Sequence, residues 1–341
     1  MRALVVSNML PDPAHPERGS FVRDQVAALR AIEGLDVDLF EFAPGSRSLA
    51  RAPLQGRRRF GHRRGSPDWK PNRYDVVHAH FGLSAWPALA IPARVRALTV
   101  HGSDLLHPRT RLATAAVLPL IELIAAVSAE LVSELPSESA RRRAQVLPCG
   151  VDVERFRPLP REQARAALGL DRERPYVLFP SDAARPEKRH DRAQALSAAA
   201  GATLLTLGGV EPDRVPLWVN AANAVVVPSE REGFGLAVLE ALACEVPVLA
   251  TPVGIHAQAL AGVEGSLCAP FGIAAWRAAL EPHLERAAPT APAKSAVSPE
   301  GVGSAPPRRV RGARASAMRF SARSMAERVA QAWRAALERS G

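Results

Sequence analysis

Short apolar runs alternate with helical patterns along most of this 341-residue chain, and this alternation restricts the possible folds more than any other feature. One series lies in the first half, at Ala3–Ser7, Val37–Phe42, Val76–Ala79, Ala97–Val100 and Ile124–Ser128. A second series follows at Tyr176–Phe179, Thr203–Leu207, Ala224–Val227 and Val246–Ala250. Apolar strands separated by helices are typical of parallel α/β sheets. The chain is therefore predicted to form two α/β lobes.

The domain boundaries follow from composition. A chain of 341 residues exceeds what one hydrophobic core usually serves, and a Pro-bounded stretch at 148–158 suits a connection between lobes. We place the first lobe at residues 1–157 and the second at 158–288. Residues 289–316 are rich in Ala, Pro, Ser and Gly, which predicts a flexible linker. Residues 317–341 show a helical pattern and should dock on the rest of the molecule.

The bulk composition is that of a folded protein in a reducing compartment. Hydrophobic residues make up 47% and charged residues 23%, so most of the chain can bury a core. Cys149, Cys244 and Cys268 are too few and too scattered for a disulfide framework or a zinc site. The first apolar run is shorter than the core of a signal peptide, and no run is long enough to span a bilayer. These features predict a cytoplasmic protein.

The chain is strongly basic, with a net charge of +10. One cluster comprises Arg51, Arg57, Arg58, Arg59, His62, Arg63 and Arg64, and a second comprises Arg308, Arg309, Arg311 and Arg314. Three interpretations stay open: solvated loops, docking of the first cluster on acidic lipid headgroups, or nucleic-acid binding. No aromatic residues interleave these arginines in the manner of stacking platforms, so nucleic acid is the weakest of the three.

A glycine-rich turn follows the strand at Ala224–Val227. Gly233 and Gly235, with Phe234 between them, precede a helical pattern that begins at Leu236. Free backbone N–H groups and the helix dipole at such a point favour phosphate, so we predict a phosphate-binding site here.

Two carboxylates flank this turn. Glu232 lies just before the predicted helix and Glu240 lies in its second turn. A carboxylate that accepts two hydrogen bonds suits the cis-diol of a ribose, and a second one suits the hydroxyls of a hexose. The alternative is that Glu232 only stabilises the helix dipole and that Glu240 is solvent-exposed.

Glu-Gly-Phe-Gly-Leu at 232–236, Glu240 and Val-Pro-Val-Leu-Ala-Thr-Pro-Val-Gly at 246–254 resemble the signature of the retaining glycosyltransferases of family 4. The resemblance extends upstream through Gly208 and through residues 215–223 and 179–188, although Asn223 stands where relatives commonly have Asp. It implies a GT-B fold, in which two Rossmann-like lobes face a central cleft and the terminal helix packs back on the N-terminal lobe. It also implies transfer from a nucleotide-diphosphate sugar with retention of configuration, without a metal ion or other cofactor.

The resemblance also assigns roles to individual residues. Arg185 and Lys188 would bind the donor pyrophosphate, although the usual Gly-Arg at the strand end is replaced by Ser-Asp at 181–182. His101 resembles the histidine that faces the transferred sugar. Gly19 resembles a glycine that lets the backbone approach the donor phosphate, although relatives usually have a glycine pair there.

The histidine pair and the three cysteines give weaker evidence for a functional site. His78 and His80 share one face of a predicted strand, which suits a metal site, but no third ligand has a suitable spacing, so packing near the cleft is favoured. The three cysteines are expected to be buried small residues. No Asp-x-Asp motif follows a strand, as a GT-A enzyme would require.

The function predicted at this point is that of a hexosyltransferase-type glycosyltransferase (EC 2.4). The donor's base, its sugar and the acceptor stay open. The basic first-lobe cluster suggests a lipid-linked or polysaccharide acceptor, and peripheral contact with the anionic inner face of the plasma membrane, as in polysaccharide biosynthesis. The alternatives are a GT-B-like epimerase or phosphorylase and a non-catalytic nucleotide-sugar binding protein; we expect no nucleic-acid partner.

Overall fold

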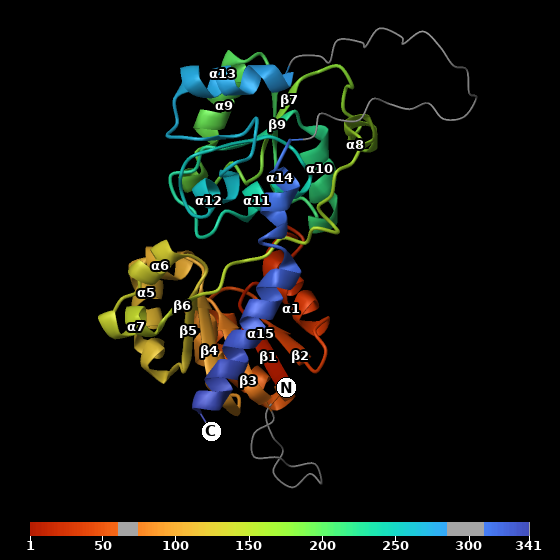
Figure 1. The fold of residues 1–341 in the computed structure, drawn as a ribbon. Helices are drawn as coiled ribbons and strands as arrows, with labels where there is room; N and C mark the ends of the chain where they lie inside the picture. The colour runs from red at the N-terminus through yellow and green to blue at the C-terminus, as the bar shows by residue number, and fades with distance from the viewer. Residues whose placement is uncertain (61–73, 285–309, 341) are drawn as a thin grey trace, which may run out of the picture.

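Two separate parallel sheets define two lobes (Figure 1) in the computed structural model, which describes residues 1–60, 74–284 and 310–340. The sheet of the first lobe has the strand order β2-β1-β3-β4-β5-β6. Its strands are β1 (Arg2–Ser7), β2 (Asp36–Glu41), β3 (Tyr74–His80), β4 (Ala93–Val100), β5 (Leu123–Ala126) and β6 (Gln145–Val146). Its helices are α1 (Ser20–Arg30), α2 (Ser46–Phe60), α3 (Gly82–Ala88), α4 (Ser103–Leu106), α5 (Pro108–Val117), α6 (Ala129–Ser133) and α7 (Glu138–Arg143).

The sheet of the second lobe has the strand order β11-β10-β9-β7-β8. Its strands are β7 (Tyr176–Phe179), β8 (Thr203–Thr206), β9 (Ala224–Val227), β10 (Val248–Ala250) and β11 (Leu267–Cys268). Its helices are α8 (Arg161–Leu168), α9 (His190–Ala199), α10 (Val215–Ala221), α11 (Leu236–Ala243), α12 (His256–Leu260) and α13 (Ile273–Leu284). Short 3₁₀ turns η2 (Pro186–Lys188) and η3 (Pro212–Arg214) lie in its loops.

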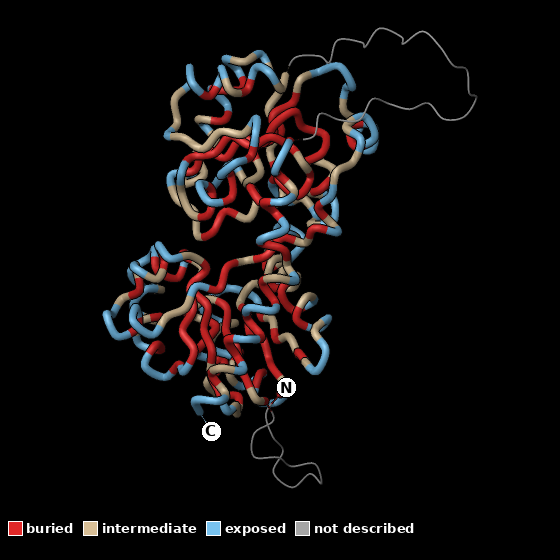
Figure 2. The backbone as a smooth tube through the Cα atoms, viewed as in Figure 1, coloured by how far each residue is buried: buried red, intermediate tan, exposed pale blue. Residues whose placement is uncertain are grey.

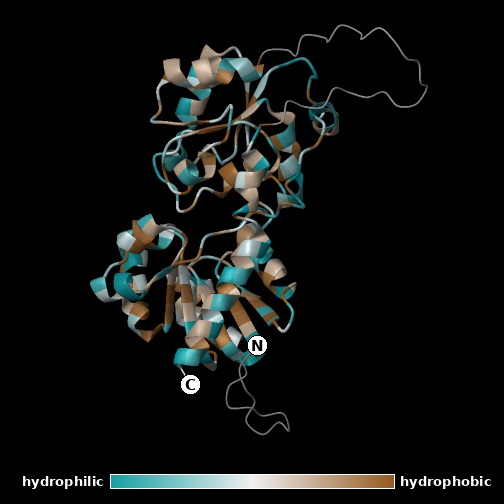
Figure 3. Cartoon of the chain, in the orientation of Figure 1, coloured by the Kyte–Doolittle hydropathy of each residue, from teal (hydrophilic) through white to brown (hydrophobic). Residues whose placement is uncertain are grey.

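The strands are apolar because helices cover both faces of each sheet. All residues of β5, β7, β9 and β10 are buried, and the strands form the red and brown centres of the two lobes in Figures 2 and 3. Parallel strands of this kind read as continuous hydrophobic runs rather than as alternating patterns. The predicted strands therefore all appear, whereas the edge strands β6 and β11 have only two residues each and gave no apolar run.

The chain crosses between the lobes twice, and the two crossings are hydrogen-bonded to each other. Val151 N donates to Phe320 O at 2.8 Å, and Ala322 N donates to Val151 O at 2.8 Å. Arg314 adds a third tie, because its guanidinium donates to the carbonyls of Val153 and Ala243 at 3.0 and 2.8 Å. The connection near residue 157 is thus a pair of bonded segments.

The C-terminal segment forms two helices, α14 (Ala313–Met318) on the second lobe and α15 (Ala322–Arg339) on the first (Figure 1). Helix α15 packs against α1, and Trp333 is buried in one cluster with residues of the first sheet. The linker predicted for 289–316 extends too far, because Ala313 and Ser316 are buried and α14 packs against α11. The earlier part of that linker, through residue 309, lies outside the described residues.

The described part of the first basic cluster lies on a helix and not on a loop. Arg51, Arg57, Arg58 and Arg59 are exposed along α2, while His62, Arg63 and Arg64 lie outside the described residues, as do Arg308 and Arg309. Arg314 was grouped with the second basic cluster. Its guanidinium instead donates to backbone carbonyls, as described above, so it is not part of a solvated basic patch. In the described part of the chain, no helix is both long enough and apolar enough to cross a bilayer.

Candidate active site

A cavity of about 390 Å³ lies where the carboxyl ends of strands from both lobes face each other. From the first lobe it is lined by the loops after β1, β3 and β4, including Phe81 and His101, and by Phe21 at the start of α1. From the second lobe it is lined by the loop after β7 and by the turn before α11. Most of the residues predicted to bind a donor therefore meet in one cavity: Arg185, Lys188, Glu232, Gly233, Phe234, Gly235, Leu236 and His101.

Lys188 and Glu232 form the most buried ion pair of this cavity. Their Nζ and Oε2 atoms are 2.5 Å apart, and the side chains are only 13% and 8% exposed. Ser229 Oγ donates to the other carboxylate oxygen of Glu232 at 2.8 Å. Burial works to raise the pKa of Glu232, but Lys188 and these hydrogen bonds outweigh it and hold that pKa below its ordinary value. Glu232 is therefore a carboxylate with a fixed orientation at neutral pH.

The turn before α11 needs glycine for two reasons. Gly235 is the N-cap of α11 with φ 101°, a left-handed conformation that favours glycine. A Cβ on Gly233 would lie 2.1 Å from the carbonyl oxygen of His101. This turn of the second lobe thus touches the His101 loop of the first lobe. From the sequence, these glycines were explained by phosphate binding. The contact between the lobes is a further reason for glycine that the sequence did not show.

His256 lies behind the same turn. Its side chain is fully buried, Nδ1 is bonded to the carbonyl of Thr251 at 2.8 Å, and Nε2 faces Gly235. Burial lowers the pKa of His256, although Glu232 acts in the opposite direction. This residue was not predicted, and its only signal was its place two residues after Gly254.

His101 directly follows β4 and lines the cavity from the first lobe. Its backbone N–H donates to the Asp104 carboxylate at 3.1 Å, and its ring lies 4.6 Å from that of Phe81 and 5.0 Å from that of Phe21. Burial lowers the pKa of His101 to about 3, so the imidazole is neutral at physiological pH. Phe81 adopts φ 71°, a conformation rarely found outside glycine. Neither phenylalanine was predicted as part of the site.

Three predicted residues have surroundings that the sequence did not show. Arg185 lines the cavity, but its guanidinium pairs with Glu187 on the same loop at 2.6 Å. Gly19 does not line the cavity; it is the N-cap of α1, where a Cβ would lie 2.5 Å from Met9 O. Glu240 lies outside the lining as well, one helical turn beyond Leu236 and Ala237.

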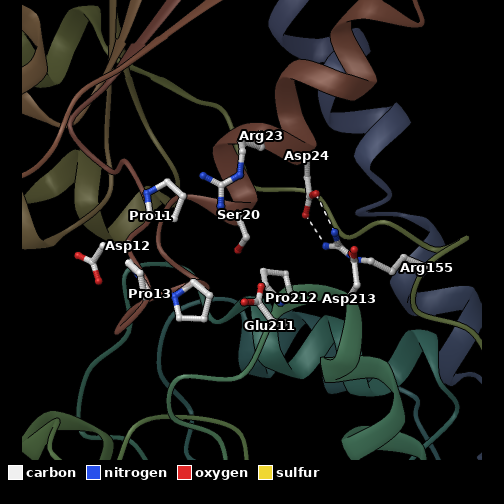
Figure 4. A pocket seen from close by; sticks show the side chains of 11 residues that line it. Pro11, Asp12, Pro13, Ser20, Arg23, Asp24, Arg155, Glu211, Pro212 and Asp213 are labelled. Carbon is white, nitrogen blue, oxygen red and sulfur yellow. Dashed lines mark hydrogen bonds and ion pairs between the residues drawn. The ribbon is translucent and has the colours of Figure 1, made fainter.

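Glu240 lies close enough to Arg155 and Asp24 to feel their charges, and these two residues line a second inter-lobe pocket of about 530 Å³ (Figure 4). Here Arg155 of the first crossing makes a bidentate ion pair with Asp24 of α1, at 2.5 and 3.0 Å, opposite the η3 turn of the second lobe. Burial raises the pKa of the half-buried Glu240 to about 7, and the nearby charge of Arg155 opposes this shift.

The cavity shows no arrangement for a metal ion. Among residues 1–60, 74–284 and 310–340, no group of three or more His, Cys, Asp or Glu side chains is placed to hold one. His78 and His80 are both buried, as the packing interpretation expected. The chemistry of the described site thus consists of cations, carboxylates, a helix N-terminus and one neutral imidazole.

Two family models match the chain in the order of its lobes. The model described as "Glycosyltransferase Family 4" matches residues 19–155, and the model described as "Glycosyl transferases group 1" matches residues 184–289. The D-inositol 3-phosphate glycosyltransferase of Actinosynnema mirum is 30% identical over 351 residues, which cover 77% of this chain and 84% of that protein. The chain belongs to the family 4 glycosyltransferases.

Other comparisons agree with this membership. The D-inositol 3-phosphate glycosyltransferase of Frankia alni is 32% identical over 258 residues, and the chain spans 63% of that relative's length. The sucrose-phosphate synthase of Thermosynechococcus elongatus has a TM-score of 0.65 at 18% identity, covering 98% of both chains. The catalytic domain of starch synthase IV from Arabidopsis thaliana, bound to ADP and acarbose, has a TM-score of 0.68 at 10% identity, covering 99% of both. The predicted GT-B fold of this family 4 chain is confirmed.

Proposed function

We propose that the protein transfers a hexose from a nucleotide-diphosphate sugar to an acceptor, with retention of configuration and without a metal ion. One observation carries this proposal. The buried Lys188–Glu232 pair and the N-terminus of α11 face His101 across a single inter-lobe cavity. A diphosphate needs the cation and the helix N-terminus, and a sugar needs the carboxylate and the imidazole.

The donor would lie along the start of α11. Its diphosphate would contact Lys188 and the N–H groups of α11, with Arg185 released from Glu187 to add a second cation. Glu232 would accept hydrogen bonds from sugar hydroxyls, and Glu240 would accept them from the ribose on the side of the second pocket. Cations placed where the leaving diphosphate gains charge stabilise the transition state and need no protein nucleophile.

The acceptor would enter from the first lobe, where the cavity wall is mainly apolar and aromatic. Phe21, Phe81 and Leu106 line it, and no lysine or arginine from the described part of the first lobe does so. The relatives reported above are named D-inositol 3-phosphate glycosyltransferases, and a phosphate group would find no cation from the described first lobe on this wall. This wall favours an acceptor with an uncharged or apolar part, such as a lipid-linked or polysaccharide acceptor.

Peripheral membrane contact fits such an acceptor. Helix α2 exposes Arg51, Arg57, Arg58 and Arg59 together with Leu54, which is 55% exposed. An exposed basic face with an apolar residue suits an anionic lipid surface. We infer that α2 docks the protein on the inner face of an anionic membrane.

The test is turnover of a panel of nucleotide sugars, with and without a lipid extract as acceptor. We expect nucleoside diphosphate release that increases with the extract, and a product whose anomeric NMR signal has the configuration of the donor. An isomerised sugar formed without acceptor would favour an epimerase, and dependence on inorganic phosphate would favour a phosphorylase. Binding without any turnover would contradict the catalytic proposal and leave a nucleotide-sugar binding protein.

A further inference from the structure

Three histidine rings stack in a row that leads from the core of the first lobe to the cavity. The ring centroids of His78 and His80 are 4.9 Å apart, and those of His80 and His101 are 5.1 Å apart. His78 and His80 are 0% and 1% exposed, and of the three rings only His101 lines the donor cavity. The two buried rings can therefore affect the cavity only through His101.

The inner end of the row has a defined tautomer. Trp333 of α15 donates its indole N–H to His78 Nδ1 at 3.0 Å. Because an indole nitrogen can only donate, His78 Nδ1 must accept, and the ring proton sits on Nε2. That Nε2 is 2.8 Å from Thr99 Oγ1, which accepts a hydrogen bond from the Nε2–H group of His78. The hydroxyl hydrogen of Thr99 is then available to another acceptor.

The outer pair shares one hydrogen. His80 Nδ1 is 2.9 Å from His101 Nε2. Burial lowers the pKa of His78 and His101 to about 3 and that of His80 well below its ordinary value, so each ring is neutral with a single N–H. Which ring donates in this contact depends on the remaining nitrogen of His80.

That nitrogen faces a small cavity behind His101. His80 Nε2 and Gln25 Oε1 are both buried and have no hydrogen-bond partner among the described residues. Both side chains line one cavity of about 10 Å³, as does Thr99. This is about the volume that a single water needs, and buried waters typically make about three hydrogen bonds to otherwise unsatisfied polar groups.

We propose that one buried water in this cavity bridges Thr99, Gln25 and His80, and that this bridge fixes His101 as the tautomer protonated on Nδ1. The water accepts from Thr99 Oγ1 and donates to Gln25 Oε1 and His80 Nε2. His80 then carries its proton on Nδ1 and donates it to His101 Nε2. The opposite arrangement would leave one hydrogen of the water unpaired, and a buried unpaired donor is rarer than an unused lone pair.

The consequence for the site rests on the proposed function, in which His101 contacts the transferred sugar. With its Nε2 occupied by His80, His101 presents an N–H donor to the cavity and not an acceptor. His80 and Gln25 are positioning residues in this account, because they contact His101 or its partner and not the substrate. The tautomer fixes the direction of the hydrogen bond to the sugar hydroxyl.

The experiment is a long-range ¹H–¹⁵N correlation spectrum of the full chain labelled with ¹⁵N-histidine, with His101 assigned by substitution. We expect a protonated Nδ1 and an unprotonated Nε2 for His101 in the wild-type protein. A protonated Nε2 on His101 would overturn the proposal. A high-resolution crystal structure without water density between Gln25 and His80 would overturn it too. Neither readout requires turnover, so this proposal and the proposed function fail separately.

Matched variants separate hydrogen bonding from packing. In His80→Asn the amide N–H₂ can replace the donor at Nδ1, whereas His80→Leu cannot donate. We expect His80→Leu to mix the two His101 tautomers and to lower kcat roughly fivefold at unchanged KM for the donor, the effect of about one neutral hydrogen bond. His80→Asn should retain the wild-type tautomer and most of kcat. Equal spectra for the two variants would show that His80 only packs. Ser197→Ala, which removes a buried unpartnered hydroxyl in the second lobe, is the control.

Discussion

At the scale of single residues, the Lys188–Glu232 pair is a buried ion pair that, in the proposed function, also receives the donor. Both side chains are nearly buried, so each charge depends on the other. A diphosphate at Lys188 would replace part of that interaction with its own charge. The pair therefore holds Glu232 ionised and oriented before the donor arrives, which is the preorganisation that electrostatic catalysis requires.

Lys188→Met should destabilise the protein by about 3 kcal/mol or more, because it leaves the Glu232 carboxylate buried without its cation. The free energy of unfolding from urea titration at neutral pH measures this. The double variant Lys188→Met with Glu232→Gln should recover most of the loss, since it removes the unpaired charge. A double variant as unstable as the single one would contradict the ion-pair account.

The raised pKa of Glu240 predicts that the stability difference between wild type and Glu240→Gln depends on pH. Its folded pKa of about 7 lies above its ordinary value of 4.5, so the ionised form is disfavoured in the fold. The resulting stabilisation is present below the ordinary pKa and is lost as pH rises through about 7. Glu240→Gln does not titrate, so its stability relative to wild type should increase as pH rises from about 4.5 to about 7 and then level off. A pH-independent difference in urea midpoint would contradict the raised pKa.

The sequence identified which residues meet in the cavity, but it did not show which side chains they pair with. Lys188, Glu232 and His101 meet in one cavity because each follows a strand, and parallel strands place their carboxyl ends at one edge. The pairing of Arg185 with Glu187, and the place of Glu240 beside Arg155, depend on side-chain rotamers and on the docking of another segment. Motif spacing along the chain carries no information on either.

At the scale of elements, the two bonded crossings decide how the lobes are joined. Gly150 lies where the crossings pack together, and a Cβ there would lie 2.7 Å from Ala322 Cα and 2.9 Å from Ser321 O. Both contacts involve backbone, which cannot move aside cheaply. The crossings can thus pair only if this position has no side chain.

Gly150→Ala should therefore destabilise the protein by about 1–3 kcal/mol, the usual cost of overpacking. Chemical denaturation followed by far-UV circular dichroism measures the loss. The control is Gly272→Ala, because a Cβ there meets nothing within 4 Å. Equal effects of the two substitutions would contradict the close packing of the crossings.

If α2 is the membrane-binding surface, its arginines should be required for binding to anionic vesicles. Reversal of Arg57, Arg58 and Arg59 to Glu should abolish co-sedimentation with vesicles that contain anionic lipid at physiological salt, because the attraction comes from these charges. The matched control reverses three exposed arginines of α15, Arg323, Arg328 and Arg334. Failure of the wild-type protein to bind such vesicles would contradict the docking proposal, as would equal loss in both variants.

The sequence predicted the long buried elements correctly but missed part of a short helix. Central strands and α1 were predicted because burial on both faces or on one stripe leaves a long apolar signal. The first part of helix α14 was mistaken for linker, since Ala313 and Ser316 are small residues typical of flexible segments. Their burial comes from close packing on α11, a tertiary effect without a periodic signal.

At the scale of the whole molecule, the two lobes make one site from residues that neither lobe contains alone. The second lobe supplies Lys188 and the α11 turn, the first supplies His101 and the aromatic wall, and the Gly233 turn touches the His101 loop. The net charge of +10 attracts anionic donors and surfaces over a longer range. Donor binding should hold the lobes in contact and exclude water from the reacting carbon.

The central claim is that a nucleotide-sugar donor is held by the α11 turn, with Glu240 at its ribose. Its most direct test is the melting temperature of wild-type and Glu240→Ala protein with a panel of nucleoside diphosphates and nucleotide sugars. A ligand at about a hundred times its Kd stabilises the native state by roughly 2.7 kcal/mol. The account predicts that one nucleotide series raises the melting temperature of the wild type and that the variant loses this effect. If no nucleotide stabilises the wild type, or if the variant responds equally, the donor-site assignment is contradicted.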